Sequence, residues 1–139
     1  MLAAITTSAW AYPALEVLHL LGVSLLLGNL FLLEARVWGA ASALDLRALA
    51  RLALALSVAG FALAAASGLV MFATQAAELL ANRVFTAKMA LIMLAGCNAG
   101  WFHARRSLER ADGTARALMG LSTVLWLATL TAGRWIAYV

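Results

Sequence analysis

Four long apolar stretches, separated by shorter links, dominate the pattern of this chain. They cover residues 13–37, 47–74, 84–103 and 115–133. A helix needs about 20 apolar residues to cross the hydrocarbon core of a bilayer, and each stretch has roughly that length or more. The pattern therefore predicts an all-α protein, a four-helix transmembrane bundle that forms a single domain over residues 1–139.

The links contain residues that favour the beginnings of helices. Pro13 suits the first turn of the first helix, because its missing N–H costs no hydrogen bond there. Ser42 or Asp45 is expected to cap the second helix, and Thr114 the fourth, through a side-chain oxygen that accepts from a free backbone N–H. Residues 111–114 are typical of a turn, and residues 75–83 are expected to form a loop.

The composition indicates a lipid environment. Hydrophobic residues make up 65% of the chain and charged residues 12%, whereas a soluble domain has about 25% charged residues. The net charge of +4 does not indicate nucleic-acid binding. The arginines lie in short links beside apolar stretches, where they can anchor the chain to anionic lipid. The bilayer is therefore an expected partner, and nucleic acid is not.

Basic residues are shared unequally between the two ends of the predicted bundle. The links after the first and third stretches carry Arg36, Arg47, Arg51, Arg105, Arg106, Arg110 and Arg116. The opposite end carries Arg83, Lys88 and Arg134. Cytoplasmic loops are enriched in basic residues, so these two links should be cytoplasmic. Both termini should then lie on the periplasmic side of a bacterial inner membrane.

Ionisable residues inside the first apolar stretch indicate a functional site. Such residues are costly in lipid, so they usually face a protein interior. His19 lies roughly 9 Å below the outer end of the predicted helix. We expect residues of all four helices to reach this level. The candidates besides His19 are Gly22, Gly68, Met71, Lys88, Gly133 and Arg134.

Two cofactors are compatible with these residues. A haem b would be bound by His19, Lys88 and Arg134 would pair with its propionates, and the three glycines would make room for the flat ring. Only one histidine lies at this level, so the iron would need Met71 or an open sixth position. His103 is expected about 18 Å away in depth, beside arginines at the other end of the bundle.

A copper ion is the other cofactor that the residues suggest. His19 and Met71 would form its site at the outer end of the bundle. Soft sulfur donors suit Cu(I), and three of them follow one another at a spacing of four residues along the third helix. This ladder, which could carry copper inward, consists of Met89, Met93 and Cys97. Methionine also fills gaps in helix interfaces, so the ladder has a structural interpretation too.

The first stretch, HLLGVSLLLGNLFLLEARVWG, resembles the first membrane helix of small bacterial proteins related to the copper-resistance CopD membrane domain. The resemblance continues through SGLVMF, NRVFTAKMALIMLAGCNAGWFH and AGRWIAY. It implies an inner-membrane four-helix bundle associated with copper or haem, within a wider group that includes di-haem cytochrome-b-type proteins. The residues it carries over are His19, Phe85 and Lys88. The paired histidines of the di-haem members are not present.

These observations leave more than one function open. The chain has no GxSxG, HExxH, CxxC or phosphate-loop motif, so we do not expect an enzyme. A protein that holds copper or haem near His19 is the first hypothesis, with copper favoured by the resemblance and haem by the cations. The second is an accessory subunit of a larger membrane complex or homo-oligomer. For the site itself, the structural alternative is a Glu16–Lys88 ion pair and a hydrogen-bonded histidine that fix helix register. Proton movement through Glu16, His19 and Asn29 is the third.

Overall fold

A computed structural model describes residues 1–110 and 112–139 of the protein. Among these residues, four helices are long and apolar enough to span a membrane, and no strand is present. They are α2 (Ala11–Val37), α3 (Leu46–Thr74), α5 (Arg83–Ala104) and α7 (Gly113–Trp135). These helices coincide with the four apolar stretches, so the expectation of an all-α architecture is confirmed.

Shorter helical segments fill much of the remaining chain. They are α1 (Leu2–Thr7), α4 (Ala76–Ala81), α6 (Ser107–Arg110) and the 3₁₀ helix η1 (Ile136–Tyr138). The expectation of a loop over residues 75–83 is wrong in part, because α4 occupies its centre. Its sequence, AAELLA, consists of strong helix formers, which explains why the link takes a helical turn.

Aspartate side chains cap two of the long helices. Asp45 accepts a hydrogen bond from the Ala48 N–H and caps α3, as one of the two expected alternatives. Asp112 accepts from the Ala115 N–H at 2.8 Å and caps α7. The expectation that Thr114 is the cap is therefore wrong. The helix begins two residues earlier than expected, at Gly113, so Thr114 already lies inside its first turn.

The first helix also begins slightly earlier than expected. α2 starts at Ala11, and Pro13 stays within its first turn, where a missing N–H still costs no hydrogen bond. The side chain of Asn82 caps α5 by accepting from the N–H groups of Val84 and Phe85. Of the turn expected over residues 111–114, residue 111 lies outside the described residues.

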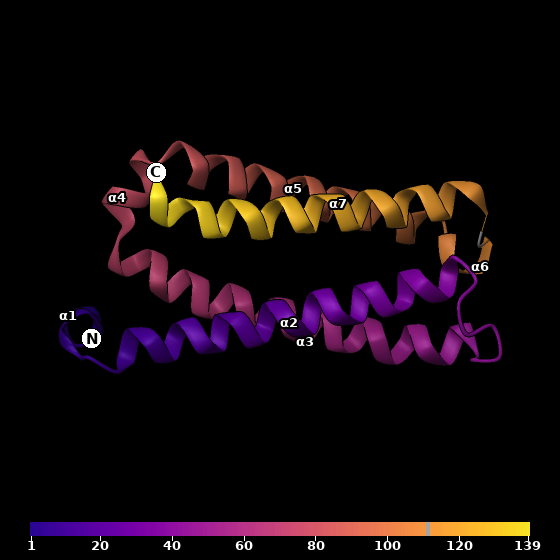
Figure 1. The fold of residues 1–139 in the computed structure, drawn as a ribbon, viewed down its shortest axis with the longest axis horizontal. Coiled ribbons are helices and arrows are strands. Elements are labelled where there is room, and N and C mark those ends of the chain that lie inside the picture. The colour runs from indigo at the N-terminus through magenta and orange to yellow at the C-terminus, as the bar shows by residue number, and fades with distance from the viewer. Residues whose placement is uncertain (111) are drawn as a thin grey trace.

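The long helices form two hairpins. α2 packs along α3, and α5 packs along α7 (Figure 1). The α2–α3 contact is very close at Gly22, where an added Cβ would lie 2.5 Å from the Ala64 nitrogen and 2.6 Å from the Gly60 oxygen. Small residues allow such an approach where lipid removes the hydrophobic drive between helices. The expectation that Gly22 makes room for a cofactor ring is wrong, because the backbone of α3 occupies that space.

The two hairpins join at one end of the molecule. We call this the link end, because it holds the α2–α3 link and α6, and we call the opposite end, which holds both termini, the terminal end (Figure 1). At the link end the Thr123 hydroxyl of α7 donates to the Glu34 carboxylate of α2. The hydrophobic core there draws on all four long helices through Leu33, Val37, Ala50, Ala53, Phe102, Ala115 and Met119. From this core toward the terminal end, α2 runs away from α7 (Figure 1).

Candidate cofactor site

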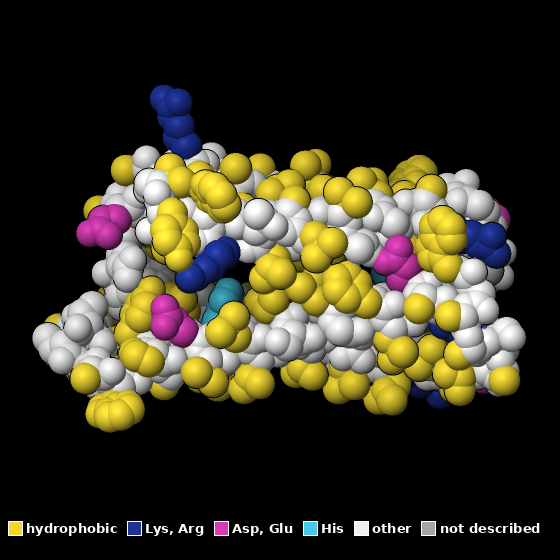
Figure 2. All heavy atoms as spheres, viewed as in Figure 1, with side chains coloured by type: hydrophobic (Ala, Val, Ile, Leu, Met, Phe, Trp, Pro, Cys, Tyr) yellow, Lys and Arg dark blue, Asp and Glu magenta, His cyan; other side chains and the backbone are white. Residues whose placement is uncertain are grey.

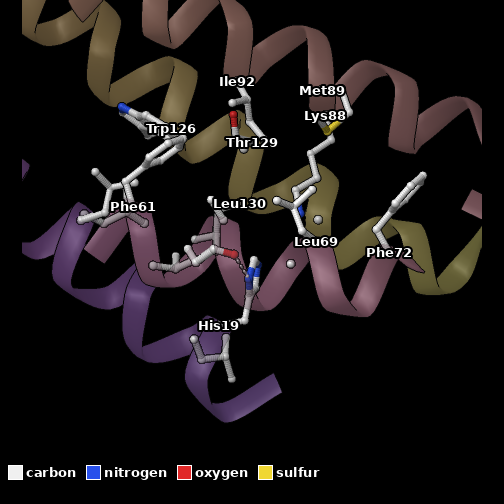
Figure 3. A pocket seen from close by; sticks show the side chains of 18 of the residues that line it. His19, Phe61, Leu69, Phe72, Lys88, Met89, Ile92, Trp126, Thr129 and Leu130 are labelled. Atoms are coloured by element: carbon white, nitrogen blue, oxygen red, sulfur yellow. Dashed lines mark hydrogen bonds between the residues drawn. The ribbon is translucent and has the colours of Figure 1, made fainter. Parts of the chain in front are cut away.

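A cavity lies between the two hairpins, in the half of the bundle nearer the terminal end. Its volume is about 460 Å³, and all four long helices contribute to its walls. Most of the wall is apolar and includes the aromatic rings of Phe61 and Trp126, whose centroids are 6.1 Å apart in an edge-to-face contact (Figure 3). Leu27 and Ile92 complete the deeper part of the wall. Such a chamber suits an apolar ligand that is oriented by a few polar groups.

His19 supplies one of those polar groups. Its ring extends from α2 toward α3, where Nδ1 lies 2.8 Å from the Ala64 carbonyl oxygen and 3.3 Å from the Ser67 Oγ. A carbonyl only accepts, so Nδ1 carries the hydrogen and donates it. The neutral ring then has a lone pair on Nε2, for which the described residues offer no hydrogen-bond partner. A histidine that binds a metal commonly has this arrangement, with Nδ1–H held by a backbone carbonyl.

Lys88 supplies the second polar group, from the opposite hairpin. Its side chain extends from α5 into the cavity toward the side that carries His19 (Figure 3). The ion pairs among the described residues are Arg105–Asp112 and Arg106–Glu109, and both lie at the link end. The alternative in which Lys88 forms an ion pair with Glu16 is therefore not realised. The ammonium group faces the cavity without a carboxylate partner from the part of the chain described here.

Two glycines make room for these polar side chains. An added Cβ on Gly68 would lie 3.2 Å from Cε1 of His19, and one on Gly133 would lie 3.2 Å from Nζ of Lys88. Both contacts are tighter than ordinary van der Waals distance. Gly68 and Gly133 thus lie at the site, as expected, and they leave space for the imidazole and the ammonium group.

A wider, more polar chamber connects the cavity to the terminal end. Its volume is about 830 Å³, and it shares His19 and Lys88 with the inner cavity. Glu16, Met71 and Arg134 line it as well. Figure 2 shows a hollow between the hairpins in which a histidine is visible, with an acidic and a basic side chain at the rim. The structure therefore brings together most of the residues expected at this level.

Arg134 is held at the rim by its own helix end. Its guanidinium donates to the Tyr138 hydroxyl at 2.8 Å and lies 5.2 Å from the centroid of that ring. The side chain therefore adds positive charge to the mouth of the outer chamber. It does not line the inner cavity, whereas Lys88 does.

The sulfur ladder expected along α5 does not lead from His19. Met89 lines the cavity, but Met93 is 68% exposed and Cys97 is exposed, and neither lines either chamber. Residues four apart rotate around a helix by roughly 40° at each step, so the later members turn away from the cavity. No group of three or more His, Cys, Asp or Glu residues that could hold a metal occurs among the described residues.

Two other polar residues of the sequence analysis lie away from the site. His103 lies in the last turn of α5, where its ring packs edge-on against Phe102 with centroids 5.2 Å apart, and it lines neither chamber. Asn29 donates to the Leu25 carbonyl of its own helix at 2.7 Å and also lines neither chamber. His19 is therefore the histidine of this site, and the polar path required for proton movement does not continue through Asn29.

Sequence reasoning missed the residues that position His19. Ser67 Oγ accepts from Nδ1 and itself donates to the Leu63 carbonyl at 2.7 Å. Gly60, Ala64 and Ser67 recur at intervals of three or four residues, which is the signature of a close helix–helix face. That spacing could have revealed the α2–α3 interface, but no side-chain pattern identifies the Ala64 carbonyl as the acceptor.

Comparison with known proteins returns no match: neither the protein-family models, nor the curated proteins, nor the solved structures include one that is significantly similar to this chain. The resemblance to the copper-resistance CopD membrane domain stays a prediction.

Proposed function

We propose that this protein is a non-enzymatic integral protein of the bacterial inner membrane that holds a b-type haem between its two hairpins. His19 Nε2 would bind its iron, and both termini lie in the periplasm. The observation that carries the proposal is the imidazole itself, whose Nδ1 is fixed by the Ala64 carbonyl at 2.8 Å while Nε2 stays free. This arrangement pre-orients one ligand atom beside an apolar cavity.

The walls and charges of the cavity support haem. Apolar and aromatic side chains suit the face of a porphyrin, and Phe72 stacks on Phe85 with centroids 5.5 Å apart between the two chambers. Lys88 and Arg134 stand nearer the terminal end, where charge-assisted hydrogen bonds to propionates would compensate their charges. Haem, when bound, supplies an iron centre for electron transfer or for binding a small ligand.

Copper is the second candidate, and one observation favours it. Met71 lines the outer chamber together with His19, which gives one nitrogen and one sulfur donor on the same side of the bundle. Such a pair suits Cu(I). The unpaired ammonium group of Lys88 opposes a bare cation at this position, and the remaining sulfur donors of α5 lie outside the chamber. These features favour haem over copper.

Metal analysis and one absorption spectrum of the purified protein test both candidates. A Soret band with about one iron per chain is the result expected for haem. Copper without a Soret band would overturn the haem proposal in favour of the second candidate. A protein that carries neither metal, and that takes up neither haem nor Cu(I) when they are added, would contradict both and leave the accessory-subunit hypothesis.

A further inference from the structure

Lys88 carries a positive charge for which the described residues provide no partner. The described residues give its Nζ no ion pair and no hydrogen bond, and it lines both the apolar cavity and the outer chamber. A charged group in an apolar setting is costly unless it is paired. This position is therefore one at which an anion from outside the chain would bind favourably.

The space around Lys88 specifies the rest of the ligand. Beyond the ammonium group lies the apolar cavity of about 460 Å³, which ends at Leu26 and Leu27. The hollow between the hairpins is visible on the side of the molecule and has charged side chains at its rim (Figure 2), so a ligand could enter there with its polar head at the rim. A molecule with one anionic head and one long apolar tail fits these features.

We propose that the cavity binds a long-chain carboxylic acid taken from the bilayer. The carboxyl group lies between Lys88 and His19, and the acyl chain lies along Phe61, Ile92 and Trp126. This proposal does not rest on haem binding, because it is based on the unpaired Lys88 and the apolar cavity. The acid and a haem would occupy the same cavity, so each would exclude the other.

The pair of polar groups favours a carboxyl head over a phosphodiester. Lys88 only donates hydrogen bonds, whereas Nε2 of His19 accepts one, because Nδ1 already donates to Ala64. A long-chain acid that enters in its neutral form can give its proton to Nε2 of His19, and the carboxylate that remains accepts hydrogen bonds from the imidazolium and from the Lys88 ammonium group. A phosphodiester has no such proton at neutral pH and would leave Nε2 without a partner.

Electron paramagnetic resonance of a spin-labelled fatty acid tests the proposal. Doxylstearic acid is added to the full-length protein in phosphatidylcholine nanodiscs, where bound label gives an immobilised component. We expect this component with the free acid, and at most a trace with its methyl ester or with spin-labelled phosphatidylglycerol. Equal immobilisation of all three would show only a general lipid boundary and would overturn the proposal, as would an absence of immobilised acid.

Variants distinguish binding of the acid from binding of haem in the same cavity. Lys88→Met should weaken binding of the acid by about tenfold or more, the effect expected for loss of one charge-assisted hydrogen bond. Arg83→Met, which removes a cation of the outer chamber only, should change it less than twofold. His19→Ala should abolish haem binding but reduce acid binding only a few-fold. Unchanged binding in a folded Lys88→Met protein would contradict the carboxylate site, whatever the result for haem.

Discussion

The imidazole of His19 depends on both helices of its hairpin for its position. Its ring is attached to α2, but its orientation is set by α3, through the Ala64 carbonyl at 2.8 Å and the space left by Gly68. A larger residue at position 68 would push the ring away, because an added Cβ alone would lie 3.2 Å from Cε1. The orientation of the His19 ring, and with it the position of Nε2, therefore depends on the glycine at position 68.

The first prediction tests this dependence on Gly68. Gly68→Leu should weaken haem binding at least about tenfold, because a misplaced ligand atom loses most of the benefit of pre-orientation. Gly96→Leu is the matched control, since an added Cβ there meets nothing within 4 Å. Haem titration followed by absorption spectroscopy measures both affinities, and equal affinities would show that Gly68 does not position His19.

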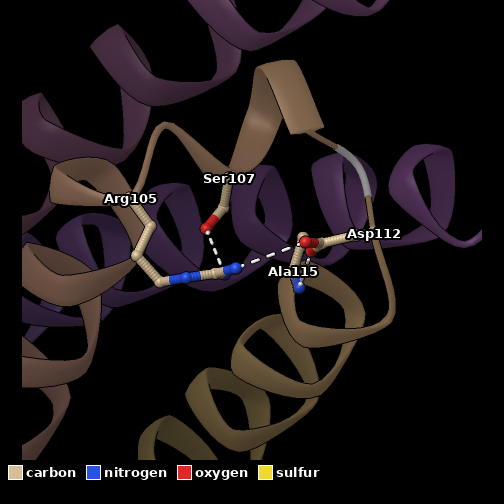
Figure 4. A network of polar contacts seen from close by, with 4 residues as sticks. All are labelled: Arg105, Ser107, Asp112 and Ala115. Atoms are coloured by element: carbon tan, nitrogen blue, oxygen red, sulfur yellow. Dashed lines mark hydrogen bonds and ion pairs between the residues drawn. The ribbon is translucent and has the colours of Figure 1, made fainter.

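The second prediction concerns pH and Asp112, which lies outside the membrane-spanning segments. The Ala115 N–H and, to a smaller extent, Arg105 lower the pKa of its carboxyl group in the folded protein (Figure 4). A lowered folded-state pKa stabilises the fold above the unfolded-state pKa, and this contribution is lost as the pH falls through the folded-state value. Asp112→Asn should therefore show a smaller drop in thermal midpoint between pH 6 and about pH 3 than the parent protein. Parallel curves from thermal unfolding in detergent would contradict this role of the carboxylate.

At the scale of the helices, the α2–α3 hairpin depends on backbone contact. Gly22 and Gly60 bring the two helices so close that neither position has room for a methyl group. The stability of the hairpin comes from van der Waals packing along the shared face, because contact between apolar side chains adds little stability when lipid surrounds them.

The third prediction compares two glycines of the same helix. Gly22→Ala should destabilise the protein by about 1–3 kcal/mol, as overpacking of a close interface does. Gly28→Ala should be neutral or stabilising, because its Cβ meets nothing within 4 Å and alanine is the better helix former. Equilibrium unfolding in mixed micelles gives both values, and equal stability of the two variants would contradict the close contact.

The helices could be predicted from the sequence, but the positions of individual side chains could not. Apolar length identified all four spans, and Asp45 was a correct capping alternative. Gly22 and Gly68 look alike in sequence, yet one contacts the α3 backbone and the other the His19 ring. The difference depends on helix rotation, which a spacing of 3.6 residues per turn does not determine closely over long distances. For the same reason, the sequence did not show that Met93 and Cys97 turn away from the cavity.

At the scale of the whole molecule, one end is closed and the other is open. The core at the link end and the Thr123–Glu34 hydrogen bond join the hairpins, and the cavity opens where these contacts stop. The expected depth of each residue along its helix predicted that His19, Lys88 and Gly133 would share a level, and all three line one cavity in the structure. The volume of that cavity could not be predicted, because it depends on the angle between the hairpins.

The fourth prediction tests the orientation of the molecule in the membrane. Cys97 is the single cysteine, so a Cys97→Ser background accepts one new cysteine at a time. Ser42→Cys, at the arginine-rich end, should react with an impermeant maleimide only after the membrane is permeabilised. Gln75→Cys, in the link to α4 at the terminal end, should react in intact spheroplasts. The reverse pattern would place the termini in the cytoplasm.

The most direct test of the haem site is chemical rescue of His19→Gly. Removing the imidazole should abolish the Soret band of haem-loaded protein, and added free imidazole should restore it by occupying the space that the side chain leaves. His103→Gly should keep its band without imidazole, because that residue lies outside both chambers. A Soret band of full intensity in His19→Gly without imidazole would show that His19 does not bind the iron and would contradict the proposed haem site.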